Sequence, residues 1–239
     1  MLDHLNRFIK KIFIYIFLST IPFSAFAEEK SIDLIHTDWS FDGLFGTFDR
    51  ASLQRGYQVY QEVCSGCHSV QHLSYRNLHE KGGPEFSIEE AKAIASQFEL
   101  EDGPNSEGEM FTRPARLSDK FVKPYPNVAA STAANGGAYP PDMSVLAKAR
   151  AGGADYIYSL LMGYDEAPAG LELDDGVYYN KFMPGNKIKM SEPIYDGMVE
   201  YSDGTSASKE QLAKDVTSFL VWAAEPHLEA QHRMGFKTL

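Results

Sequence analysis

The 239-residue sequence is poor in cysteine, with two in all, and poor in basic residues, with 22 Lys and Arg against 33 Asp and Glu. A structural zinc site is excluded, because it needs further Cys or His ligands in a second cluster and no other cysteine is present. The net charge of −11 disfavours nucleic-acid binding, which needs a basic surface. Repeats and low-complexity tracts are also lacking. An apolar content of 44% allows one good-sized core.

The two cysteines belong to one short motif, in which Cys64 and Cys67 are followed at once by His68. This C-x-x-C-H spacing is the pattern of covalent c-type haem attachment. Both thiols on one tight turn can reach the vinyl groups on one porphyrin edge, and the imidazole then lies beneath the iron as the proximal ligand. A thioredoxin-type redox pair would need a βαβ context, which the flanking residues do not supply. An ordinary disulfide is the remaining alternative.

Residues 1–27 have the parts of a secretory signal peptide: three basic residues, an apolar run over 12–21 and an Ala-Phe-Ala cleavage site at 25–27. The run is short for a membrane-spanning helix, so we favour a cleaved signal over an anchor. The mature chain then starts near Glu28, with 19 Lys and Arg, 32 Asp and Glu, and a net charge of −13. This charge favours a basic soluble partner. Export agrees with haem attachment, which takes place outside the cytoplasm.

Residues 28–48 are rich in aromatic side chains and glycine, and they are predicted to form an extended arm over an apolar surface. Asp49 is the predicted N-cap of the helix that follows. One face of that helix carries residues at i, i+4, i+7 and i+11, namely Leu53, Tyr57, Tyr60 and Cys64. This face delivers Cys64 to the haem edge, and a helix that ends in C-x-x-C-H opens a cytochrome c fold.

Short helices are predicted at residues 88–98 and at residues 155–161, with Gly163 just past the second. Between them, residues 99–110 are predicted as an acidic loop that contains glycine. This loop is either a docking surface or, by default, a solvated acidic face. Prolines make the rest of the segment to residue 128 irregular.

A glycine-rich stretch at residues 135–142 leads into a predicted helix that starts at the prolines. Asp142 or Ser144 is its predicted cap. Residues 164–206 are predicted as a long loop over a buried group, because loops of this length are unusual unless functional. Ser208 opens the last predicted helix, with Gln211 completing a capping box. Its predicted buried face is Leu212, Val216, Phe219, Leu220 and Ala223.

The second axial ligand of the iron is not decided by spacing. Met143 and Met162 lie in predicted helices and are interpreted as packing residues, the commoner role of methionine. Met183 and Met190 both lie in the 164–206 loop, which can bring a thioether to the iron. The remaining histidines are disfavoured as ligands: His72 and His79 lie close to the attachment turn, His227 and His232 lie in a charged tail, and His36 lies in the arm.

The order of the motifs resembles the cytochrome c1 family, the haem c subunits of the quinol–cytochrome c oxidoreductase (bc1) complex. The resemblance runs from about Trp39 to Lys237. It is carried by LQRGYQVY and CSGCH at 53–60 and 64–68, NGGAYPPD at 135–142, DYIYSLL at 155–161, MPGNKIKMSEPIY at 183–195, and the segment 215–226 that ends in WAAEP. C-x-x-C-H alone marks any c-type cytochrome, whereas the ordered set is specific to this family.

The resemblance implies a mainly α, cytochrome c-like helical haem domain with long irregular loops over residues 28–239, including the arm at 28–48 and a tail at 227–239. It implies one covalent haem c on Cys64 and Cys67, with His68 and Met190 as the axial ligands. It further implies that Arg150 pairs with a haem propionate. The other implied haem-pocket residues are Tyr156, Asn135 and Pro141, the last lying against the haem.

The implied function is one-electron transfer from the Rieske iron–sulfur protein to a cytochrome c, beside cytochrome b, at the periplasmic face of the bacterial inner membrane. No acid–base or nucleophilic chemistry is expected of the chain itself. A thioether ligand favours Fe(II) and raises the potential. The alternatives are a free periplasmic electron carrier and a haem enzyme such as a peroxidase.

Members of the family continue beyond a segment like 232–237 into a transmembrane helix, whereas this chain ends at Leu239. No stretch of residues 28–239 approaches the ~20 apolar residues of a spanning helix. We therefore expect a truncation where that helix would begin, with the haem domain complete.

Overall fold

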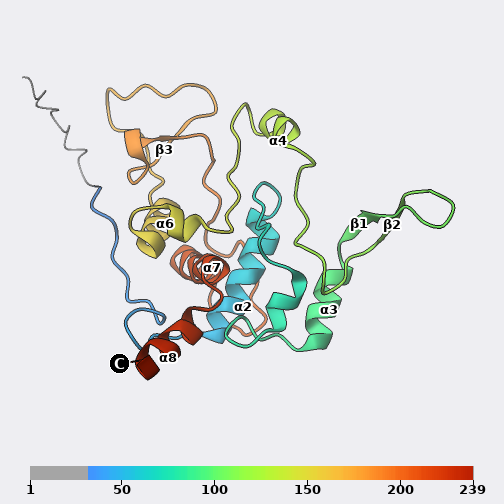
Figure 1. Cartoon of the computed structure of the whole chain (residues 1–239). Helices are drawn as coiled ribbons and strands as arrows, with labels where there is room; N and C mark the ends of the chain where they lie inside the picture. Colours follow the sequence, from blue (N-terminus) through green and yellow to red (C-terminus); the bar gives the residue numbers. More distant parts are fainter. Residues whose placement is uncertain (1–31, 239) are drawn as a thin grey trace, which may run out of the picture. The chain divides into compact units, whose positions relative to one another are not determined.

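Two helices, α2 (Arg50–Val59) and α7 (Lys209–Ala224), pack across each other at the centre of the fold (Figure 1). Asp49 begins α2 as predicted, because its carboxylate accepts hydrogen bonds from the amides of Ala51 and Ser52. Ser208 begins α7, and its hydroxyl accepts from the amide of Gln211. The predicted inner face of α7 is buried throughout.

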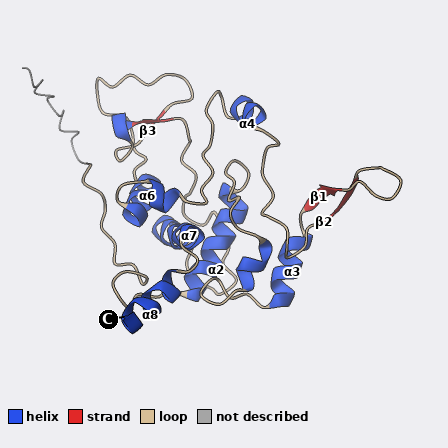
Figure 2. Ribbon diagram, viewed as in Figure 1, coloured by secondary structure: helices blue, strands red, loops and turns tan. Residues whose placement is uncertain are grey.

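The computed structural model describes residues 32–238, which, apart from Ile32, belong to one compact unit, Asp33–Leu239. The predicted signal peptide, residues 1–27, lies outside the described residues. Helices predominate over short strands (Figure 2), as the mainly α prediction requires. The other elements are a π-helix at Tyr60–Cys64, 3₁₀ turns at Tyr75–His79 and Pro184–Asn186, α3 (Ile88–Ser96), β1 (Glu99–Asp102), β2 (Phe111–Pro114), α4 (Val128–Ala134), α5 (Leu146–Ala149), α6 (Gly153–Met162), β3 (Tyr178–Tyr179), β4 (Lys187–Ile188) and α8 (Leu228–Thr238).

Aromatic side chains fill the space where α2 meets α7. Tyr60 stacks on Phe219 with ring centroids 5.5 Å apart, and Tyr57 meets the same ring edge-on at 5.8 Å. Phe121 stacks on Tyr75 at 4.9 Å and lies 6.1 Å from Tyr60. Such pairs add to the free energy of area burial. The predicted inner face of α2 therefore packs into the core up to the turn before Cys64.

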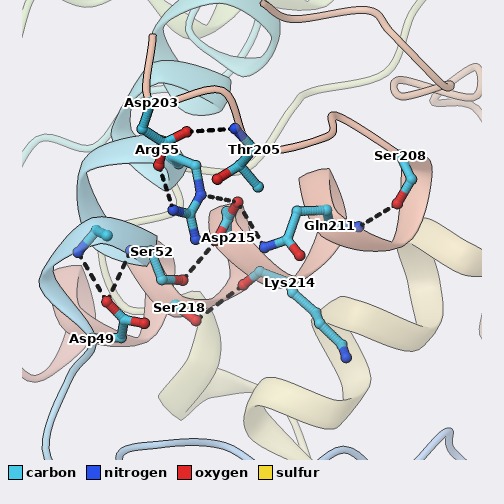
Figure 3. A network of polar contacts seen from close by, with 11 residues as sticks. Asp49, Ser52, Arg55, Asp203, Thr205, Ser208, Gln211, Lys214, Asp215 and Ser218 are labelled. Atoms are coloured by element: carbon cyan, nitrogen blue, oxygen red, sulfur yellow. Dashed lines mark hydrogen bonds and ion pairs between the residues drawn. The ribbon is translucent and has the colours of Figure 1, made fainter. Parts of the chain in front are cut away.

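A buried ion pair accompanies this packing (Figure 3). The Asp215 side chain on α7 is fully buried, and its carboxylate accepts from Arg55 Nε at 2.8 Å, Ser52 Oγ at 2.8 Å and Gln211 Nε2 at 3.0 Å. Arg55 also donates to Asp203, in the loop before α7, at 2.8 Å. A buried charge is tolerated only when it is paired and hydrogen-bonded. The network therefore favours one alignment of α2 on α7.

Residues 99–110 were predicted as a loop, and 103–110 do form the loop of a hairpin that projects away from the helices (Figure 1). The prediction was wrong for residues 99–102, which form β1. β1 pairs with β2 in antiparallel register, with Asp102 opposite Phe111. Arg113 on β2 forms ion pairs with Asp102 across the hairpin and with Asp119 at 2.6 Å. These ion pairs offset part of the negative charge of the hairpin. That charge had favoured the prediction of an irregular loop.

Three further elements were not predicted as the structure has them. α4 begins at Val128, the last residue of the segment predicted to be irregular, because the Asn127 side chain caps it by accepting from the Ala130 amide. Among the described residues no side chain caps α5, which begins only at Leu146. The tail from residue 227 contains α8, held by buried Glu229, which accepts from Arg50 at 2.7 Å and from the Phe48 amide at 3.0 Å.

The described part of the N-terminal arm, residues 32–48, contains no helix or strand. Phe41 and Phe48 are buried, and Trp39 stacks on Phe41 at 5.5 Å. Trp39 Nε1 also donates to Asp155, in the first turn of α6, at 2.7 Å. Over residues 32–238, no helix has both the length and the apolar character needed to cross a membrane.

The crossing of α2 on α7 depends on the absence of a side chain at Gly56. A Cβ built there would lie 2.0 Å from the carbonyl oxygen of Asp215 and 2.8 Å from Phe219 Cβ. We predict that Gly56→Ala lowers the free energy of unfolding by about 1–3 kcal/mol or more, because overpacking forces the helices apart. Urea unfolding measures this. Gly235→Ala in α8 is the control, since a Cβ there meets nothing within 4 Å; equal stability of the two variants would contradict the prediction.

Candidate haem site

The π-helix that continues α2 ends at the first cysteine of the motif. The carbonyl of Cys64 accepts hydrogen bonds from the amides of Cys67, at 3.1 Å, and His68, at 2.9 Å, and so closes a tight turn. Cys64 is half-buried, Cys67 is exposed, and both thiols are free among the described residues. Burial raises the pKa of the Cys64 thiol to about 12. The backbone from Cys64 to His68 thus forms a tight turn.

The half-buried imidazole of His68 is oriented by a hydrogen bond to the backbone carbonyl of Pro141, with Nδ1 and the oxygen 2.8 Å apart. A carbonyl only accepts, so Nδ1 carries the hydrogen and Nε2 keeps a free lone pair. Burial lowers the pKa of His68, against the raising effects of the Pro141 hydrogen bond and of Asp142. A neutral imidazole with a free Nε2 is the form that binds metals. The donor set fits haem iron.

The segment that carries Pro141 is attached to the residues that follow His68. The Asp142 carboxylate accepts from Ser69 Oγ at 2.7 Å and from the Gln71 amide at 3.0 Å. The prediction that Asp142 or Ser144 caps a helix was therefore wrong, because both side chains bond to this neighbouring segment instead. The signal in the sequence, an acid and a serine after two prolines, is the same for a helix cap and for a link between segments.

Met183 and Met190 are both half-buried in the long loop. The carbonyl of Met190 accepts a hydrogen bond from the hydroxyl of Tyr164 at 3.0 Å. The Met183 sulfur lies 3.8 Å from the hydroxyl of Tyr156 on α6. Met143 is buried in the core, as predicted, although it precedes α5. No local pattern indicated the Tyr164 contact, because it joins residues 26 positions apart.

The remaining residues implied by the resemblance differ in their contacts. Arg150 is exposed after α5, and its guanidinium donates to the Ala149 carbonyl at 3.1 Å. Asn135 ends α4 and donates to the Ser131 carbonyl at 2.7 Å. The structure thus brings Pro141 to His68 and Tyr156 to Met183, while Arg150 and Asn135 bond to neighbouring backbone.

A cavity of about 220 Å³ lies beside the exposed cysteine. Its walls are Cys67 with Ser69 and Gln71, several residues from 123–131, and Tyr139 with Pro140. The wall formed by 123–131 was missed in the sequence, because its prolines indicate only irregular structure. Neither His68 nor Met190 lines this cavity. A mainly helical unit with a C-x-x-C-H turn and an imidazole oriented for a metal has the features of the cytochrome c class of haem proteins.

The comparison with known sequences makes the assignment specific: the Cytochrome C1 family model matches residues 39–239, and the chain belongs to this family. It is 50% identical over 214 residues to "Cytochrome c1-2, heme protein, mitochondrial" of Solanum tuberosum, covering 90% of this chain and 81% of the relative. "Cytochrome c1, heme protein, mitochondrial" of Schizosaccharomyces pombe is 50% identical over 89% of this chain and 68% of the relative.

One relative is bacterial, and its name contains both cytochrome b and cytochrome c1. "Cytochrome b/c1" of Bradyrhizobium diazoefficiens is 47% identical over 83% of this chain, and the match covers 32% of that longer protein. The family resemblance predicted from the ordered motifs is therefore confirmed, as is the mainly α fold.

The Tyr164 hydroxyl is predicted to hold the Met190 segment against the body of the protein. Tyr164→Phe removes only this donor, at a cost of about 1 kcal/mol for a typical hydrogen bond. We expect several-fold faster amide hydrogen exchange over residues 186–194, because local opening becomes easier. Tyr178→Phe, at an exposed tyrosine of the same loop, is the control. Unchanged exchange in Tyr164→Phe would show that the hydroxyl does not restrain the segment.

Proposed function

We propose that this protein carries single electrons through one haem within a bc1 complex. The family match over residues 39–239 carries the proposal. Relatives are named as haem proteins, and that of Candida albicans is named as a subunit of the cytochrome b-c1 complex. The freed Nε2 of His68 beside a C-x-x-C-H turn supports the same function from the structure. When bound, the haem supplies a one-electron Fe(III)/Fe(II) couple.

The haem is held by thioether bonds from Cys64 and Cys67, with His68 and Met190 as axial ligands. Support for Cys64, Cys67 and His68 comes from the tight backbone turn on which they lie, and Met190 is assigned from the family to which the chain belongs. With His68 and Met190 both bound to it, the iron would be closed to oxygen and peroxide. The thioether of Met190 raises the potential by favouring the reduced state.

Further residues bind the edges of the haem. The exposed Arg150 guanidinium pairs with a propionate, as a cation suited to bidentate carboxylate binding. The other pocket residues are Tyr156, Asn135 and Pro141. The Pro141 carbonyl supports this role, because its hydrogen bond fixes the tautomer of the proximal imidazole.

The electron donor is the Rieske iron–sulfur protein and the acceptor is a cytochrome c, with cytochrome b as the neighbouring subunit. The haem domain, residues 28–239, lies at the periplasmic face of a bacterial inner membrane after removal of residues 1–27 as a signal peptide. Membrane association comes through the complex and through the C-terminal helix that the family resemblance implies. An acidic chain suits a basic acceptor, because opposite charges raise encounter rates. A free carrier and a peroxidase-like enzyme are disfavoured by membership of the family.

The axial assignment is tested by Met190→Leu in the haem-loaded protein. Loss of a thioether ligand should lower the midpoint potential by the order of hundreds of millivolts, within the range that axial ligands control. Redox titration measures it. Met183→Leu is the matched control from the same loop, and its potential should stay near that of the unmodified protein. If Met183→Leu lowers the potential and Met190→Leu leaves it unchanged, Met183 holds the iron.

The acidic hairpin is tested as the docking surface for the acceptor. Electron transfer to a basic cytochrome c should slow as ionic strength rises, because salt screens exposed charges. Stopped-flow kinetics over a salt series measure the slope. A triple variant with Glu101, Glu107 and Glu109 changed to Gln should flatten it. The control variant neutralises Glu172, Asp174 and Asp175, so its net charge changes by the same amount as that of the hairpin variant. A flat slope in the unmodified protein, or equal slopes in the two variants, would contradict docking at the hairpin.

A further inference from the structure

The carbonyl that orients His68 belongs to a segment that the Asp142 carboxylate helps to hold in place. Pro141 supplies the carbonyl, and the next residue, Asp142, is half-buried. Its carboxylate accepts from Ser69 Oγ at 2.7 Å and from the Gln71 amide at 3.0 Å through Oδ2, and from the Ser144 amide at 2.9 Å through Oδ1. One side chain thus links the Pro141 segment to the residues directly after His68.

The geometry requires a carboxylate and not merely a polar side chain. Two of the donors, the amides of Gln71 and Ser144, are fixed by the backbone and approach different oxygens of Asp142. An amide side chain has one acceptor oxygen, so asparagine would turn an NH₂ group toward one of these N–H groups. An unsatisfied or opposed donor costs more than the hydrogen bond itself is worth.

Two more hydrogen bonds run between the same segments. The Met143 amide donates to the Ser69 carbonyl at 2.8 Å, and the His72 amide donates to Ser144 Oγ at 3.0 Å. Met143 and Ser144 are both buried. The two segments are therefore joined on both sides of Asp142, and the Pro141 carbonyl lies one residue from this carboxylate.

We propose that Asp142 is a positioning residue for the proximal histidine, acting through the Pro141 carbonyl to set the direction and strength of the hydrogen bond from His68 Nδ1. This inference rests on the proposed function, in which His68 ligates the haem iron. A hydrogen bond at the second nitrogen orients a metal-binding imidazole and raises its basicity. A more basic imidazole favours Fe(III), so Asp142 holds the midpoint potential below the value that a loosened segment would give.

The test is Asp142→Asn in the haem-loaded protein, with the midpoint potential as the readout. Outer-shell partners of metal ligands affect affinity by roughly tenfold or more, and a tenfold loss of preference for Fe(III) raises a one-electron potential by ~59 mV. We expect a rise of about this size. Glu62→Gln is the charge control, because it removes the same charge from an exposed residue near Cys64; it should move the potential much less.

Ser69→Ala separates positioning from charge, since it deletes one hydrogen bond to Asp142 and leaves the charge intact. A smaller rise in the same direction is expected. If Asp142→Asn raises the potential and Ser69→Ala leaves it unchanged, the effect is electrostatic and the positioning role is overturned. Should Asp142→Asn fail to fold, Ser69→Ala alone decides, with a rise supporting the proposal and no change overturning it.

The haem spectrum of the unmodified protein distinguishes a failure of this inference from a failure of the proposed function on which it rests. A haem spectrum without the low-spin His/Met signature would overturn the proposed ligation, and the positioning role with it. A normal low-spin spectrum, together with an unmoved potential in Asp142→Asn and Ser69→Ala, would overturn the positioning role alone.

Discussion

The close crossing of α2 on α7 is the constraint on which the rest of the structure depends. At Gly56 the two backbones approach so closely that no side chain fits, and the buried Asp215 carboxylate beside it is matched by Arg55. Sterics and charge pairing thus favour one alignment of the helices. Since the π-helix that ends at Cys64 continues α2, this alignment also determines where the attachment turn lies.

The site is assembled from segments that are distant in the chain and joined by hydrogen bonds to backbone. Pro141 meets His68 across 73 positions, and Tyr164 meets the Met190 carbonyl across 26. Backbone groups have fixed places once the core is packed, so a bond such as that of His68 to the Pro141 carbonyl has a well-defined direction. A redox centre benefits from such rigidity, because its geometry then differs little between the two oxidation states.

Much of the fold followed from local signals in the sequence. Caps at Asp49 and Ser208 and an apolar period of 3.6 predicted α2 and α7, because each signal acts within one turn of helix. Other elements were missed because their causes are not local in this sense. The β1–β2 hairpin depends on Arg113 pairing across strands, and the tail helix α8 is held by Glu229 bonding to Arg50, 179 positions away.

The candidate site also combines features that local sequence signals predict with contacts between distant residues. The C-x-x-C-H motif and the family could be recognised from the sequence, since the spacing of residues and the order of motifs are properties of the chain itself. Spacing did not decide between Met183 and Met190 as the second axial ligand, and the sequence predicted Asp142 or Ser144 as a helix cap. Only the tertiary structure decided that Asp142 bonds to Ser69 and Gln71, because which donors reach a carboxylate depends on how distant segments pack and not on their order in the chain.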